Sequence, residues 1–177
     1  AGVSDAGCDR LNVLFNTDAG RGYLTGRQGI DPGMVGELRH LGLSGIANVL
    51  AAIKTARYFD LTEKDLIVTV ATDSSVLYES EREKSIATDF GGEFDTLSAA
   101  ETFARCLMGV DGDHYLETGH RERRRIFNLG YFTWVEQRGV ELEDFDRRAD
   151  QRFWKALQEV LPVWDEMIDD FNARTGV

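Results

Sequence analysis

The sequence predicts an α/β fold in which a sheet-containing part is followed by a helical extension. Residues 66–71 (LIVTVA) form a short apolar run rich in β-branched residues, which is typical of a strand buried on both faces. Residues 11–15 (LNVLF) are a second such run. Between them, residues 46–53 place apolar side chains at the i, i+3, i+4, i+7 spacing of a helix face. A helix between two strand-like runs is the pattern of an α/β unit.

Composition limits the partners and the compartment. The 177 residues include 20 basic and 31 acidic side chains, a net charge of −11, which argues against binding to nucleic acid or to an anionic membrane. No apolar run is long enough to span a membrane, and no signal segment opens the chain. The two cysteines, Cys8 and Cys106, favour a reducing environment, so we expect a cytoplasmic protein. The chain begins with Ala1, which indicates processing or a piece of a longer protein.

The first part of the chain is expected to alternate loops, strands and helices. Residues 1–10 read as a loop, and the glycine-rich residues 17–29 read as a surface connection, with an anion-binding loop using Arg21 or Arg27 as the alternative. Asp31 and Pro32 form a good helix start, as N-cap and first helical residue, for a helix reaching about His40.

The second part is expected to be helical. We place an α/β segment at residues 1–90 and a helical extension at 91–177, with one helix over 96–108 and a long amphipathic helix over 150–174. Pro162 should kink or split the long helix. The aromatic residues of this part are predicted to form helix–helix core, or in part an interface; they are Phe127, Tyr131, Phe132, Trp134, Phe153, Trp154, Trp164 and Phe171.

The candidate site follows the second predicted strand. Thr72, Asp73, Ser74 and Ser75 are small polar residues at its carboxyl end, where open α/β sheets bind ligands. The alternative is that these residues only cap the following helix.

The central stretch resembles a known family. A Gly42-Leu43-Ser44-Gly45 turn, an alanine-rich helix, the run 67–74 (IVTVATDS) and Tyr78 are similar to the C-terminal catalytic segment of fold-type II pyridoxal-phosphate enzymes, such as cysteine synthase, cystathionine β-synthase and threonine synthase. Thr72 stands where the family has proline, and the Gly/Ser turn is one residue shorter. The resemblance implies an open sheet of which this chain holds the C-terminal part.

The resemblance also implies a cofactor site. Ser74 would bond the pyridine nitrogen of pyridoxal phosphate, which favours β-elimination or β-replacement on an amino-acid substrate. The remaining cofactor-binding residues implied are Gly42, Ser44, Gly45, Thr72 and Asp73.

The catalytic lysine of that family has no counterpart here. Lys54 reads as a solvated helix-face residue, Lys64 lies in a polar loop, and Lys84 and Lys155 are expected to be exposed. The chain should therefore be inactive alone and need an N-terminal half or partner subunit, in a homo- or hetero-oligomer. The alternative function is a non-catalytic interaction or regulatory subunit.

Two other groups of charged residues are interpreted as structural. The acidic and histidine residues of 111–120 lack the spacing of a zinc or calcium site, so a polar loop is favoured over a metal centre. The arginines of 121–125 are interpreted as partners for acidic helices, because Glu122 interrupts them in an acidic chain.

Overall fold

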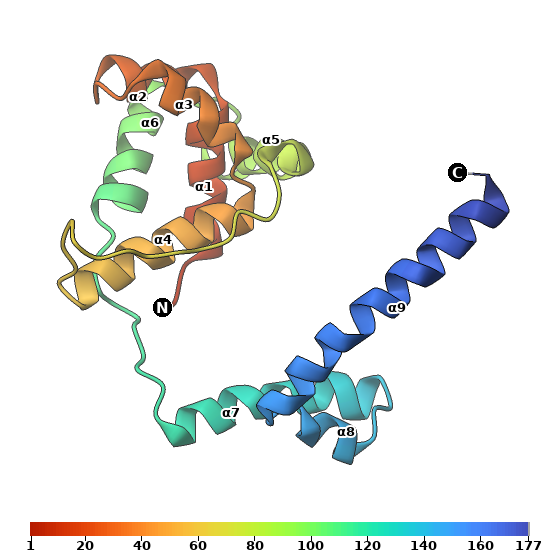
Figure 1. Ribbon diagram of the computed structural model, residues 1–177. Helices are drawn as coiled ribbons and strands as arrows, with labels where there is room; N and C mark the ends of the chain where they lie inside the picture. The colour runs from red at the N-terminus through yellow and green to blue at the C-terminus, as the bar shows by residue number, and fades with distance from the viewer. Residues whose placement is uncertain (177) are drawn as a thin grey trace. The chain divides into compact units, whose positions relative to one another are not determined.

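The computed structural model describes residues 1–176, and all regular secondary structure in that range is helical (Figure 1). The prediction of an α/β open sheet is therefore wrong, and so is the assignment to a fold-type II, cysteine synthase-like domain. A strand exists only where a neighbour accepts its backbone hydrogen bonds, and residues 1–176 supply no such neighbour for either predicted strand. The chain divides into two compact units, residues 1–116 and 117–177, so the predicted division after residue 90 falls inside the first unit.

The first unit is a bundle of helices joined by short turns and one long extended segment. Its helices are α1 Asp5–Asn16, α2 Asp18–Gly26, α3 Pro32–Glu37, η1 Leu38–His40, α4 Leu43–Tyr58, η2 Ser75–Tyr78, α5 Glu79–Asp89, α6 Thr96–Phe103 and η3 Ala104–Met108.

Helix α1 is the centre of this unit, and it contains the predicted strand 11–15. Leu11, Val13 and Leu14 are fully buried, because α2, α4, α5 and α6 all pack against α1. A helix covered on every side is apolar all round, which from sequence alone looks like a buried strand. The Ser4 hydroxyl, which accepts a hydrogen bond from the amide of Gly7 at 3.4 Å, starts the helix.

Helix α2 lies in the glycine-rich stretch that was predicted to be a loop. Thr17 caps it by accepting a hydrogen bond from the amide of Gly20 at 3.2 Å and also donates to the carbonyl of Val13 at 2.9 Å. A Cβ at position 20 would lie 1.9 Å from the carbonyl oxygen of Leu14. Gly20 therefore allows α2 to approach the backbone of α1 closely.

Helices α3 and α4 confirm the predicted helix starts. Asp31 caps α3 and accepts from the amide of Met34 at 3.0 Å. Ile46 and Leu50 of α4 are buried as predicted, but Val49 is exposed.

Residues 66–71, the other predicted strand, are extended but unpaired, and they run alongside α4 in Figure 1. The exposed fractions are 87% for Leu66, 82% for Val68 and 66% for Val70, so a segment predicted to be doubly buried is largely solvated. The side-chain amide of Asn48, on α4, donates to the carbonyl of Val70 at 2.9 Å.

The second unit consists of α7 His120–Tyr131, η4 Phe132–Gln137, α8 Leu142–Arg147 and α9 Gln151–Thr175. Its centre is Phe145, which is 2% exposed and lies 4.9 Å from the ring of Phe127, with the Arg148 guanidinium 4.3 Å from the Phe145 ring. Tyr131 also packs against Phe145, with ring centroids 6.1 Å apart. The core prediction is wrong for five other aromatic residues, which are exposed, and their role in an interface stays a prediction; they are Phe132, Trp134, Trp154, Trp164 and Phe171.

Helix α9 continues through Pro162, so the predicted split does not occur. A proline removes one hydrogen bond from the helix ladder, and in α9 the turns on both sides of it still form. Within residues 1–176, no helix combines the length and the apolar character needed to cross a membrane.

Candidate functional site

A polar cluster forms where the extended segment ends. The Ser44 hydroxyl lies 2.5 Å from the Thr72 hydroxyl and 3.2 Å from a carboxylate oxygen of Asp73. The Tyr78 hydroxyl donates to the other Asp73 oxygen at 2.5 Å. The amide of Gly42 donates to the backbone carbonyl of Asp73 at 2.9 Å. The cluster therefore ties the turn before α4 to the residues that follow the extended segment.

Gly42 is required for this arrangement. A Cβ at position 42 would lie 2.1 Å from a carboxylate oxygen of Asp73 and 2.8 Å from the ring of Tyr78. A side chain at position 42 would therefore displace the Asp73 carboxylate from its place against this turn.

The hydrogen bonds set the charge of the cluster. Donation from the Tyr78 hydroxyl, assisted by Ser44 and Thr72, holds the pKa of Asp73 below its ordinary value. The same bond raises the pKa of Tyr78, because it favours the protonated phenol. At neutral pH the cluster presents a carboxylate whose oxygens already accept hydrogen bonds. It is suited to positioning a polar group of a ligand and poorly suited to taking up a proton.

The structure brings together four of the six predicted site residues: Gly42, Ser44, Thr72 and Asp73. Ser74 is the N-cap of η2, but its side chain makes no capping hydrogen bond. Gly45 is buried below the cluster, where a Cβ would lie 3.3 Å from Leu41. Tyr78 was noted for the resemblance without a role, yet it makes the shortest contact to Asp73.

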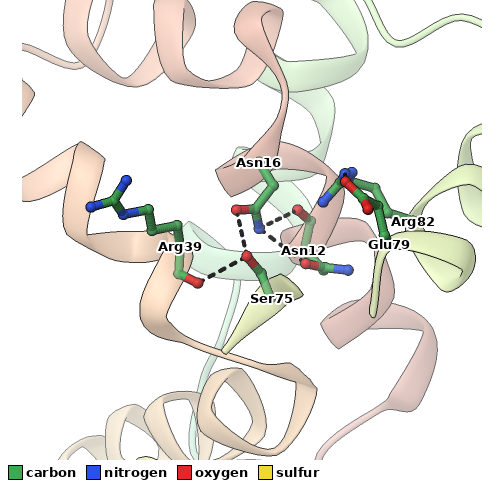
Figure 2. Close-up of polar contacts among 6 residues, drawn as sticks. All are labelled: Asn12, Asn16, Arg39, Ser75, Glu79 and Arg82. Atoms are coloured by element: carbon green, nitrogen blue, oxygen red, sulfur yellow. Dashed lines mark hydrogen bonds and ion pairs between the residues drawn. The ribbon is translucent and has the colours of Figure 1, made fainter. Parts of the chain in front are cut away.

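The sequence placed Ser75 in the candidate site or as a helix cap, but it did not predict that this residue anchors the turn. Figure 2 shows its hydroxyl, which donates to the side-chain oxygen of Asn16 at 2.9 Å or to the carbonyl of Arg39 at 2.8 Å. The Asn16 amide in turn donates to the backbone and side-chain oxygens of Asn12, each at 3.0 Å. Ser75 is 4% exposed, so these bonds fix the start of η2 against α1. No local sequence pattern indicates this contact, because Asn16 lies 59 residues from Ser75.

A second candidate region is a cavity of about 620 Å³ in the first unit. The N-terminal half of α1, Lys54 on α4, residues 105–110 and the loop at 113–114 line it. Lys54 is only 8% exposed, so its prediction as a solvated helix-face residue is wrong. Its ammonium group donates to the carboxylate of Asp113 and, at 3.0 Å, to the carbonyl of the same residue. Hydrogen bonding to this ammonium holds the pKa of Asp113 below its ordinary value.

The two thiols near this cavity are not activated. Burial raises the pKa of Cys8 to about 11, and burial also raises the pKa of Cys106, although Arg10 and Arg105 act in the opposite direction. Both thiols are therefore protonated at neutral pH, which makes them poor nucleophiles. Lys54 is already paired with Asp113. The cavity has the size to hold a small molecule, but the Lys54 ammonium and the Asp113 carboxylate in its wall already bind one another.

Comparisons with protein-family models, with curated proteins and with solved structures find no match to this chain.

Proposed function

We propose that this chain is one component of a larger protein, and that a partner chain completes it by taking residues 66–70 as an additional strand of a β-sheet. The observation that carries this proposal is the exposure of that extended segment. Leu66, Val68 and Val70, which alternate along it, are each at least 66% exposed. Side chains at alternate positions of an extended chain share one face. One side of the segment is therefore a row of branched apolar groups in water.

The backbone of the segment is also free to pair. Within residues 1–176, the backbone of 66–70 takes part in a single hydrogen bond, in which the Asn48 side chain donates to the carbonyl of Val70. In strand addition, an exposed sheet edge binds an extended segment through main-chain hydrogen bonds, and pockets receive its alternate side chains. Residues 66–70 offer both kinds of contact. Pairing would bury apolar surface that now lies in water, and each Å² buried would stabilise the complex by about 25 cal/mol.

Hydrogen exchange provides the test. We expect native mass spectrometry of the chain, purified gently from its source, to show a second polypeptide. The amides of 66–70 should exchange at least about tenfold more slowly in that complex than in the isolated chain. The proposal would be overturned by a complex in which the amides of 66–70 exchange as fast as in the free chain. It would also be overturned if the chain purified from its source as a monomer.

A matched pair of variants makes the test specific. Val70 and Leu97 are both 66% exposed, and Leu97 lies in the first turn of α6. Val70→Asp should abolish the complex, because it places a carboxylate on the pairing face. Leu97→Asp should leave the complex intact, because an acidic residue suits the first turn of a helix.

The polar cluster favours a second role for the completed protein. Thr72 and Asp73 follow the carboxyl end of 66–70, so pairing of that segment would place the cluster at the edge of the partner's sheet. Sheet edges at the carboxyl ends of strands are common ligand sites. We propose that Ser44, Thr72 and Asp73 contribute polar groups to a ligand site shared with the partner. Pyridoxal phosphate and an amino-acid substrate stay predictions for that site.

Cofactor binding separates this role from that of a non-catalytic interaction subunit. Titration with pyridoxal phosphate should give the visible absorbance of bound cofactor with the complex and none with the isolated chain. In the complex, Asp73→Asn should weaken cofactor binding without dissociating the partner. A complex that forms but binds no cofactor would remove the shared site and leave the interaction role.

A further inference from the structure

Helix α9 carries an apolar stripe that the rest of its unit does not cover. Its members recur at alternating intervals of three and four residues and are between 42% and 61% exposed; they are Trp154, Leu157, Leu161, Trp164, Ile168 and Phe171. This spacing of 3.5 residues on average is that of a coiled-coil seam. Six large apolar side chains in one line are more than scattered surface residues.

The rest of the second unit meets α9 only near its beginning. The indole of Trp154 donates to the carbonyl of Arg148 at 2.9 Å. In Figure 1, α9 leaves α7 and α8 after its first turns. Near the other end of α9, the Thr175 hydroxyl bonds to the carbonyl of Phe171 and Arg174 pairs with Asp170, both within the helix. The stripe from Leu157 onward therefore needs another molecule or segment to cover it.

The two ends of α9 carry opposite charge. Within α9, residues 151–156 hold two basic side chains and no carboxylate, whereas residues 165–170 hold four carboxylates and no basic side chain; Arg174, in the last turn, pairs with Asp170. A parallel pair of α9 helices would place two acidic ends side by side. An antiparallel pair would place the acidic end of each helix beside the basic end of the other, which is favourable within a Debye length of about 8 Å. The dipoles of the two helices would also point in opposite directions in the antiparallel pair, which is favourable.

We propose that the occupant of the stripe is α9 of a second copy of this chain, packed antiparallel about a two-fold axis. When the two-fold axis passes between Leu161 and Trp164, Leu161 of each copy faces Trp164 of the other copy. The same register pairs Leu157 with Ile168 and Trp154 with Phe171. The seam of 18 residues is about 26 Å long at 1.5 Å per residue. Pro162 lies between the seam positions on the outer side of the helix, so its missing hydrogen bond does not interrupt the stripe.

This pairing is independent of the strand addition proposed for residues 66–70. It uses a different unit of the chain and a partner of identical sequence. The isolated chain should therefore form a homodimer whether or not a second polypeptide is present.

Sedimentation equilibrium of the purified full chain tests the pairing. We expect a dimer that dissociates on dilution. Leu161→Glu should raise the dimer Kd at least about a hundredfold, because the two-fold axis buries the new carboxylate twice. The matched control is Val163→Glu: Val163 is 52% exposed, against 51% for Leu161, but lies on the opposite side of α9. The control should leave the Kd within about threefold of the original.

Charge reversal tests the orientation. Asp169→Lys combined with Asp170→Lys should weaken an antiparallel dimer and strengthen a parallel one, and both effects should shrink at high salt. A dimer strengthened by this change would overturn the antiparallel arrangement. A monomer at about 50 µM, or equal effects of Leu161→Glu and Val163→Glu, would overturn the pairing itself. Val70→Asp should not change the dimer Kd; loss of the dimer in this variant would assign self-association to the extended segment instead.

Discussion

At the scale of single residues, the hydrogen bond between Tyr78 and Asp73 makes stability depend on pH at both extremes. The pKa of Asp73 is lowered in the folded chain. Its contribution is complete above the ordinary aspartate pKa of about 3.9 and is lost as the pH falls through the lowered folded value. The pKa of Tyr78 is raised. Its contribution is complete below about 10 and is lost as the pH rises through the raised folded value.

Urea unfolding of the original chain and of Tyr78→Phe measures this effect. The difference in unfolding free energy should be constant between about pH 4 and 10 and should shrink outside that range. Asp73→Asn should remove the dependence on the acid side. A difference that does not change down to pH 2 would show that the hydrogen bond is absent in solution.

Two neighbouring serines make a second prediction at this scale. Ser75→Ala should destabilise the first unit by about 1–3 kcal/mol, because it removes the buried hydroxyl that donates to the side-chain oxygen of Asn16 or to the carbonyl of Arg39. Ser74→Ala should change stability by less than about 0.5 kcal/mol, since its side chain makes no capping bond. Thermal or urea unfolding of both variants gives the comparison. Equal losses would mean that the buried network does not hold η2.

At the scale of the element, the approach of α2 to α1 depends on Gly20. Gly20→Ala should cost about 3 kcal/mol or more, because the new Cβ would overlap the backbone of Leu14 and force α2 away. Gly22→Ala is the control in the same helix, because a Cβ there meets no atom within 4 Å. That change should stabilise the chain by about 0.5–1 kcal/mol through helix propensity. Stability no lower in Gly20→Ala than in Gly22→Ala would contradict the observed crossing.

Elements with local start signals were predictable from the sequence, and elements defined by their neighbours were not. The Asp31-Pro32 pair and the apolar face of 46–53 specify α3 and α4 without reference to the rest of the chain. Residues 11–15 and 66–71 look alike in sequence, yet one is buried helix and the other exposed and unpaired. A short apolar run does not show what will pack on it. Ser4 and Thr17, both helix caps, were the missed signals for α1 and α2.

The polar cluster was partly predictable for a different reason. Gly42, Ser44, Thr72 and Asp73 were chosen from a resemblance whose fold is wrong, and they nevertheless lie together. Glycine and small polar residues on both sides of an apolar segment mark turns. Here those two turns meet because the extended segment leads back along α4. The role of Ser75 depends on Asn16, 59 residues away, which no local pattern shows.

At the scale of the whole molecule, the two units should unfold separately. The core of the first unit contains twelve buried residues, including Leu11, Leu14 and Ile46, whereas Phe145 is the one buried apolar residue described in the second. A unit with so little core has little stability of its own.

The melting temperature of the second unit should therefore rise with protein concentration, because pairing of α9 stabilises it by mass action. The first unit should melt at a temperature independent of concentration. Calorimetry at two concentrations about tenfold apart measures both transitions, with Leu161→Glu as the control that removes the dependence. A single transition independent of concentration would contradict separate unfolding.

The unpaired segment 66–70 also limits the concentration that this protein can reach in a cell without aggregating. An extended, apolar, β-branched stretch with free backbone groups pairs with copies of itself as readily as with a partner's sheet, and such stretches seed aggregates. If the proposed partner covers this segment, chains made in excess of that partner would be lost to aggregation or to quality-control proteases. Matched synthesis of the two polypeptides, or their assembly during translation, would avoid that loss.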